Sequence, residues 1–126
     1  MYALLIYGDD SSWVDLPDDE RARLRALELP EWHSLFDELA RADPTYAGKE
    51  LDGRRTAKVV TVRDGERVVT DGPYAEVKEA LGGYYLFECA SIEDALHWAA
   101  RVPGAEHGSI EVRPVYSDPT DPEVGP

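Results

Sequence analysis

The sequence predicts one α+β domain in which an antiparallel sheet carries two main helices on one face. Short apolar or β-branched segments alternate with two longer segments of helical periodicity, in the order strand, helix, hairpin, short helix, strand, helix, strand. The chain has 126 residues and is 43% hydrophobic, which suits a single domain with its own core. This order matches a ferredoxin-like α+β sandwich.

The first part of the chain is predicted to form a strand and a helix interrupted at a proline. Residues 1–7 are an apolar run of strand length, and Pro17 with the acids after it is typical of a helix start. Pro30 lacks an amide hydrogen, so we expect the helix to break or kink there. The apolar side before this point is Leu24 and Leu27. The core-facing side of residues 31–42 is Trp32, Leu35, Phe36 and Leu39.

The middle of the chain is predicted to form a hairpin. Residues 56–63 and 66–70 are rich in β-branched side chains, and Asp64-Gly65 between them favours a two-residue turn. Asp71-Gly72-Pro73 then ends the second arm. Residues 74–81 are predicted to form a helical segment of one or two turns.

The last part of the chain is predicted to hold a strand at 84–90, a helix and a strand at 109–116. Ser91 is the expected N-cap, with Asp94 three residues on. The core stripe of this helix is Ile92, Ala95, Leu96, Ala99 and Val102. We therefore place the domain at 1–116 and expect a flexible, acidic, proline-rich tail at 117–126.

Neither side of the predicted strand at 84–90 is polar, since Tyr84 and Leu86 alternate with Tyr85 and Phe87. Two helices cover only one face of such a sheet. Something apolar must cover the other face, and a second copy of the chain is the simplest cover. The sequence therefore predicts a homodimer.

Charge and composition exclude several classes of partner. The chain has 26 acidic and 13 basic residues, a formal charge of −13, which repels nucleic acid. No apolar run approaches the ~20 residues of a membrane span, and the start lacks the features of a signal peptide, so we expect a cytoplasmic protein without a membrane partner. One cysteine and three scattered histidines do not form a metal motif, and no nucleotide fingerprint is present, so we expect no metal and no cofactor.

Five segments together resemble a known family. They are residues 4–8 (LLIYG), 62–66 (VRDGE), 71–74 (DGPY), 81–85 (LGGYY) and 108–114 (GSIEVRP). With these segments the chain resembles YCII-related proteins of the DGPF subgroup. The resemblance implies a dimeric α/β barrel built from two ferredoxin-like protomers.

The resemblance implies less about activity. Most members have no assigned activity, some are encoded beside extracytoplasmic-function sigma factors, and a few relatives are lyase-like enzymes acting on chlorinated hydroxyquinol compounds. A histidine–aspartate pair has been proposed for related proteins. Asp71 is the residue of this sequence on the family's aspartate, and His33 is the histidine nearest the family's histidine. Counted back from Asp43-Pro44, the family position falls on Trp32, about 100° around a helix from His33.

Each candidate site residue also has a structural interpretation. Asp71 is a candidate general base, but an aspartate before Gly-Pro also serves as a cap or in an Asx-turn. His33 is a candidate catalytic residue, or it pairs with Asp37 on the helix surface. The candidate ligand-binding aromatic residues are Tyr7, Trp32, Tyr74 and Tyr84. In a small α+β domain such side chains also belong to cores and interfaces.

Two functional hypotheses follow. The first is a homodimer that binds a small aromatic or carbonyl compound and is a lyase-like enzyme using acid–base chemistry centred on Asp71. The alternative is a non-enzymatic binding or regulatory module associated with an extracytoplasmic-function sigma factor.

Overall fold

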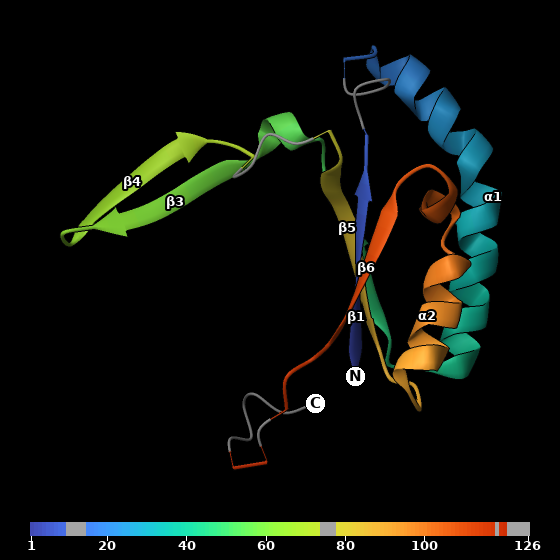
Figure 1. Cartoon of the computed structure of the whole chain (residues 1–126). Coiled ribbons are helices and arrows are strands. Elements are labelled where there is room, and N and C mark those ends of the chain that lie inside the picture. The colour runs from blue at the N-terminus through green and yellow to red at the C-terminus, as the bar shows by residue number, and fades with distance from the viewer. Residues whose placement is uncertain (10–14, 74–77, 118, 121–126) are drawn as a thin grey trace.

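A computed structural model describes residues 1–9, 15–73, 78–117 and 119–120 of the chain. Over these residues the protein is an α+β domain with an antiparallel sheet and two helices, as the sequence predicts (Figure 1). The sheet has four strands, one of them a short strand at 47–50 that the sequence did not predict, and the hairpin forms a separate two-stranded sheet. The elements in chain order are β1 (Tyr2–Gly8), α1 (Asp18–Ala42), β2 (Ala47–Glu50), the 3-10 turn η1 (Arg54–Thr56), β3 (Lys58–Arg63), β4 (Glu66–Asp71), β5 (Ala80–Phe87), α2 (Ile92–Ala100), the 3-10 turn η2 (Pro103–Glu106) and β6 (Ser109–Pro114).

The main sheet has the strand order β2-β5-β1-β6, and each neighbouring pair is antiparallel. β1 therefore lies between a strand from the middle of the chain and a strand from its end. Leu4 of β1 is paired with Tyr85 on one side and with Val112 on the other. Both helices lie on the same face of this sheet (Figure 1).

The core lies between the helices and the sheet. Alternation along the strands directs every second side chain to this layer, which is why the apolar residues of β1 and β5 recur at a spacing of two. The buried apolar side chains are Leu4, Tyr85 and Phe87 from the sheet, Leu35 and Leu39 from α1, Ala95 and Ala99 from α2, and Val102 after α2.

The opposite face of the sheet is open. Alternation places Leu5 and Tyr7 of β1 and Tyr84 and Leu86 of β5 on this face, and all four are half-buried by their neighbours. No helix of the described residues lies over them (Figure 1). The sheet therefore has one covered and one uncovered apolar face.

α1 does not break at Pro30, so of the expected break or kink the break is wrong. Asp18–Ala42 is a single helix of 25 residues with Pro30 inside it. A proline interrupts only its own backbone hydrogen bond and crowds the carbonyl one turn earlier, and packing of the following turns on the sheet offsets this cost. Before Pro30 the helix packs less closely, so Leu24 and Leu27 are exposed rather than part of the core.

The hairpin forms as predicted, but the segment after it differs. β3 and β4 are joined at Asp64-Gly65, where both residues have positive φ, 52° and 79°. This matches a hairpin turn that favours Asp-Gly. Of the predicted helical segment at 74–81, residues 74–77 lie outside the described residues, and Ala80 and Leu81 belong to β5 instead. Pairing with β1 favours the extended conformation there, because β1 continues to Gly8.

α2 begins as predicted. The Ser91 hydroxyl accepts a hydrogen bond from the Asp94 amide at 3.2 Å, the bond of an N-cap. Ala95, Ala99 and Val102 are buried, whereas Ile92 and Leu96 of the predicted stripe are exposed. Trp98, which the predicted stripe omits, packs against the core beside Ala95 and Ala99, so the buried side of α2 is rotated from the predicted one.

A buried carboxylate connects α1 to the segment after β5. One oxygen of Asp43 accepts hydrogen bonds from the Thr45 amide (2.9 Å) and hydroxyl (2.6 Å), and the other accepts from the Glu88 amide (2.9 Å). Hydrogen bonds from the Thr45 hydroxyl and from these two amides lower the pKa of Asp43. Asp43 thus joins the C-terminal end of α1 to the end of the central strand β5.

We expect Asp43→Asn to lower the free energy of unfolding by about 1–3 kcal/mol at neutral pH, because the amide nitrogen would face the Glu88 amide, a second donor. A carboxyl group whose folded-state pKa is lowered stabilises the protein above its unfolded pKa, and this contribution is lost as pH falls through the folded pKa. The difference in the free energy of unfolding between native protein and variant, measured by urea unfolding, should therefore become smaller below about pH 4. A difference that stays constant down to pH 2 would contradict this role of Asp43.

Candidate functional site

A cavity of about 370 Å³ lies between α1 and the covered face of the sheet. It is within the ~300–1,000 Å³ range of small-molecule pockets. Its walls come from four segments: the end of β1, the middle of α1, β2 with the loop after it, and the start of β5. The space is left because α1 packs closely at Leu35 and Leu39 but less closely toward its N-terminal end.

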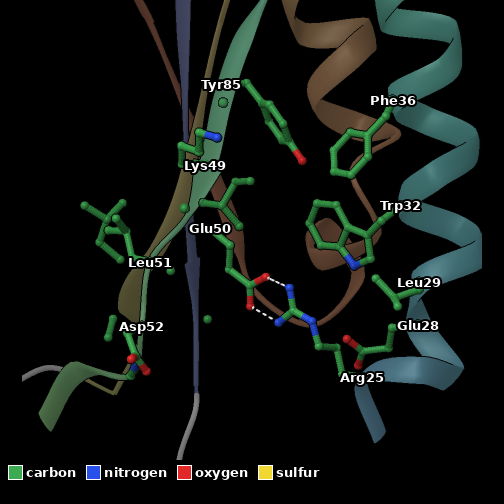
Figure 2. A pocket seen from close by; sticks show the side chains of 18 of the residues that line it. Arg25, Glu28, Leu29, Trp32, Phe36, Lys49, Glu50, Leu51, Asp52 and Tyr85 are labelled. Atoms are coloured by element: carbon green, nitrogen blue, oxygen red, sulfur yellow. Dashed lines mark hydrogen bonds and ion pairs between the residues drawn. The ribbon is translucent and has the colours of Figure 1, made fainter. Parts of the chain in front are cut away.

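Aromatic rings form the inner wall of the cavity (Figure 2). Trp32 and Phe36 come from successive turns of α1, and their ring centroids are 6.2 Å apart. Phe36 in turn meets Tyr85 of β5 edge-on, with a centroid distance of 5.7 Å. Leu29 continues the apolar wall along α1. This arrangement offers flat apolar surfaces to a planar ligand.

The hydroxyl of Tyr85 and the indole nitrogen of Trp32 are polar groups of this inner wall that lack a partner among the described residues. Tyr85 is only 7% exposed, and its hydroxyl points into the space between β5 and α1 (Figure 2). Burial raises the pKa of Tyr85, so the hydroxyl stays protonated and is a hydrogen-bond donor at neutral pH. This hydroxyl is therefore available to donate a hydrogen bond to a ligand in the cavity.

Gly48 of β2 positions the Tyr85 ring. A Cβ atom at residue 48 would collide with Cδ1 of Tyr85 and would lie 2.8 Å from the Tyr84 carbonyl oxygen. The ring of Tyr85 therefore lies directly over the backbone of Gly48, its partner in the strand pairing. A side chain at this position would push the ring toward the cavity or out of the core.

An ion pair lies at the opening of the cavity. Arg25 of α1 donates to both carboxylate oxygens of Glu50 of β2, and the Nη1 to Oε1 distance is 2.6 Å (Figure 2). This hydrogen bond raises the pKa of Arg25, and nearby Glu28 adds to the effect. Both partners are about half exposed, which suits a contact that can open to admit a ligand.

The charges around the cavity are mostly negative. Four carboxylates line it, against two basic groups, Arg25 and Lys49. The carboxylates are those of Asp9, Glu28, Glu50 and Asp52. With the formal charge of −13 on the whole chain, this lining disfavours anionic ligands.

The sequence-predicted catalytic residues lie away from this cavity. Asp71 is at the end of β4 in the hairpin, its side chain is 85% exposed, and it forms a cross-strand ion pair with Lys58. The Lys58 ammonium lowers the pKa of Asp71. His33 is on the exposed surface of α1, with its ring 6.3 Å from that of Phe36. The structure does not bring the two residues together in this cavity.

The predicted ligand-binding residues are divided between the two faces of the sheet. Trp32 lines the cavity. Tyr7 and Tyr84 lie on the open face, where the Tyr7 hydroxyl donates to Glu111 at 3.4 Å. Burial, and then the charge of Glu111, raise the pKa of Tyr7. Tyr74 lies outside the described residues.

Sequence reasoning did not select Tyr85, Gly48 or the Arg25–Glu50 pair as site residues. Arg25 and Glu50 are 25 positions apart on different elements, so no local motif could connect them. A signal for Tyr85 was present, because a tyrosine at a core position of a strand needs a partner for its hydroxyl.

Within 1–9, 15–73, 78–117 and 119–120, no three histidine, cysteine or acidic side chains are grouped so that they could bind a metal ion. In the same part of the chain, no helix combines the length and hydropathy needed to span a membrane.

We expect Gly48→Ala to destabilise the fold by ~1–3 kcal/mol, because the added methyl group would displace the Tyr85 ring. Gly8→Ala is the matched control: Gly8 also lines the cavity, but a Cβ there would have no atom within 4 Å. Chemical unfolding of both variants, followed by far-ultraviolet circular dichroism, measures the difference. Equal stability of the two variants would contradict the role assigned to Gly48.

The family model described as the YCII-related domain matches residues 1–117. An uncharacterized protein of Rhizobium meliloti (strain 1021) is 38% identical over 122 residues, which cover 91% of this chain and 91% of that protein. The match spans the whole main sheet, both helices and the hairpin. The chain belongs to the YCII-related family.

Proposed function

We propose that the protein binds a small aromatic compound of neutral or positive charge in the cavity between α1 and the sheet. The observation that carries this proposal is the hydroxyl of Tyr85, which faces the cavity from a largely buried ring and has no partner among the described residues. The rings of Trp32 and Phe36 supply stacking surface, and the Tyr85 hydroxyl supplies one directed hydrogen bond. The excess of carboxylates at the opening supplies the charge preference.

A series of three probes with one ring system and different charges tests the proposal: tryptamine, indole and indole-3-acetate. A ligand that binds only the folded state stabilises it and so raises the midpoint temperature of unfolding. At a free ligand concentration a hundred times the dissociation constant, the free energy of unfolding rises by about 2.7 kcal/mol. We expect the largest thermal shift with tryptamine, a smaller one with indole and the smallest with indole-3-acetate. Tyr85→Phe keeps the ring and should reduce the shifts.

The outcomes are distinct. Equal thermal shifts in the native protein and in Tyr85→Phe would show that the Tyr85 hydroxyl does not contact the ligand. The largest shift with indole-3-acetate would refute the charge preference. No shift with any probe would argue against an aromatic ligand. A smaller thermal shift in Trp32→Phe than in the native protein checks that a bound probe lies beside α1.

The enzymatic hypothesis is separable from binding. The resemblance assigns the acid–base role to Asp71, which is not among the residues that line the cavity. Asp71→Asn should therefore leave probe binding unchanged. If the native protein turns over a substrate and Asp71→Asn does not, that loss would support a catalytic role of Asp71 at a site outside this cavity. The sigma-factor association of the alternative hypothesis stays a prediction from the resemblance.

We also propose that the protein functions as a homodimer of ferredoxin-like protomers joined through the open faces of their sheets, forming a dimeric α/β barrel. Support comes from the strand order β2-β5-β1-β6 with two helices on one face, the order expected of this fold. Further support comes from the open face, where Leu5, Tyr84 and Leu86 lie without a helix over them. A second copy would bury these side chains.

Leu86→Lys should weaken the dimer at least about tenfold, because it places an ammonium in the proposed interface. The change reduces the net negative charge, so charge repulsion between copies cannot explain the loss. Leu27→Lys on α1, where the native side chain is 74% exposed, is the matched control. Sedimentation equilibrium measures the dissociation constants, and a native protein that is monomeric at micromolar concentration would refute the dimer.

A further inference from the structure

The β3–β4 hairpin carries exposed valines on both of its faces. Val60 and Val62 are 58% and 61% exposed, and Val69, paired across the hairpin with Val60, is 45% exposed. Alternation places these three on one face, which we call the valine face. Val68 lies on the other face and is 42% exposed. Exposed apolar groups gathered in one small element are typical of an interaction surface.

The described part of the same chain leaves this hairpin uncovered. Among the described residues, β3 and β4 pair with each other and with no other strand. Figure 1 shows the hairpin projecting from the sheet on the side away from both helices. An isolated two-stranded hairpin is at best marginally stable in water. A well-formed hairpin with exposed valines therefore indicates that another surface packs against it.

Charge distinguishes the hairpin from the rest of the chain. The hairpin, residues 58–71, contains three basic and three acidic side chains and is formally neutral, although the whole chain has a formal charge of −13. Alternation places Arg67, paired with Val62, on the valine face. Within the described part of the chain, neither Arg63 nor Arg67 forms an ion pair. A surface that complements the valines and Arg67 of the valine face is apolar and acidic.

We propose that the hairpin is an intersubunit arm whose valine face packs against the body of a second copy of this chain. The body of each copy is strongly acidic and complements Arg67, and the arm projects on the same side as the uncovered sheet face (Figure 1). In a two-fold dimer each arm would contact the other copy, so the contact would be made twice. The inference rests on the proposed homodimer and adds a second contact region to it.

The test is a triple variant, Val60→Thr, Val62→Thr and Val69→Thr. Threonine keeps the branched shape and strand preference of valine but adds a hydroxyl that is costly to bury in an apolar contact. The matched control replaces three exposed leucines of the helices: Leu24→Gln, Leu27→Gln and Leu96→Gln. We expect the arm variant to raise the dimer dissociation constant by at least about a hundredfold and the control to leave it near the native value.

Sedimentation equilibrium of the native protein, both triple variants and Leu86→Lys separates the outcomes. An arm variant with the native dissociation constant overturns the arm, even when Leu86→Lys disrupts the dimer. An arm variant that dissociates while Leu86→Lys stays dimeric supports the arm and rejects the sheet-face interface. A monomeric native protein overturns both proposals and assigns the valine face to a different partner.

A second variant guards against misfolding of the hairpin. Arg67→Glu leaves every valine in place and reverses one exposed charge on the valine face. We expect a weaker dimer with an unchanged circular dichroism spectrum. The triple valine variant is uninformative if it does not fold. In that case, a dissociation constant for Arg67→Glu equal to that of the native protein overturns the proposal.

Discussion

The packing of two aromatic rings of β5 against both helices is the interaction on which the rest of the structure depends. Phe87 meets Trp98 of α2 with a centroid distance of 6.4 Å, and Tyr85 meets Phe36 of α1 at 5.7 Å. Because β5 lies between β1 and β2, these two contacts hold both helices against the middle of the sheet. The cavity exists because α1 continues past Tyr85 toward its own N-terminal end, and the backbone of Gly48 leaves room for the ring.

The fold class could be predicted because its signals are local. Valine-rich strands around Asp64-Gly65 predicted a hairpin, and Ser91 with Asp94 predicted the start of α2. The errors occurred where tertiary packing outweighs local preference. Pro30 lies inside α1 because the following turns are packed on the sheet, and residues 80 and 81 are extended because β1 offers them a partner.

The candidate site could be predicted only in part. Trp32 was selected from the sequence and lines the cavity, but its partners come from β2 and β5, which are distant in sequence. The Arg25–Glu50 ion pair depends on the direction in which α1 crosses the sheet, and no spacing rule encodes that direction. Asp71 and His33 were selected by resemblance, and that information concerns sequence position rather than the distance between side chains.

The strand order has a consequence for how the chain acquires its structure. The β3–β4 hairpin closes through neighbours in sequence, and such contacts form within microseconds. β1, in contrast, is paired on one side with β6, whose residues lie about a hundred positions further along. During synthesis on a ribosome the first strand therefore waits, with one edge unpaired, until nearly the whole domain has emerged. The acidic character of the chain helps to keep such incomplete sheets apart during this interval.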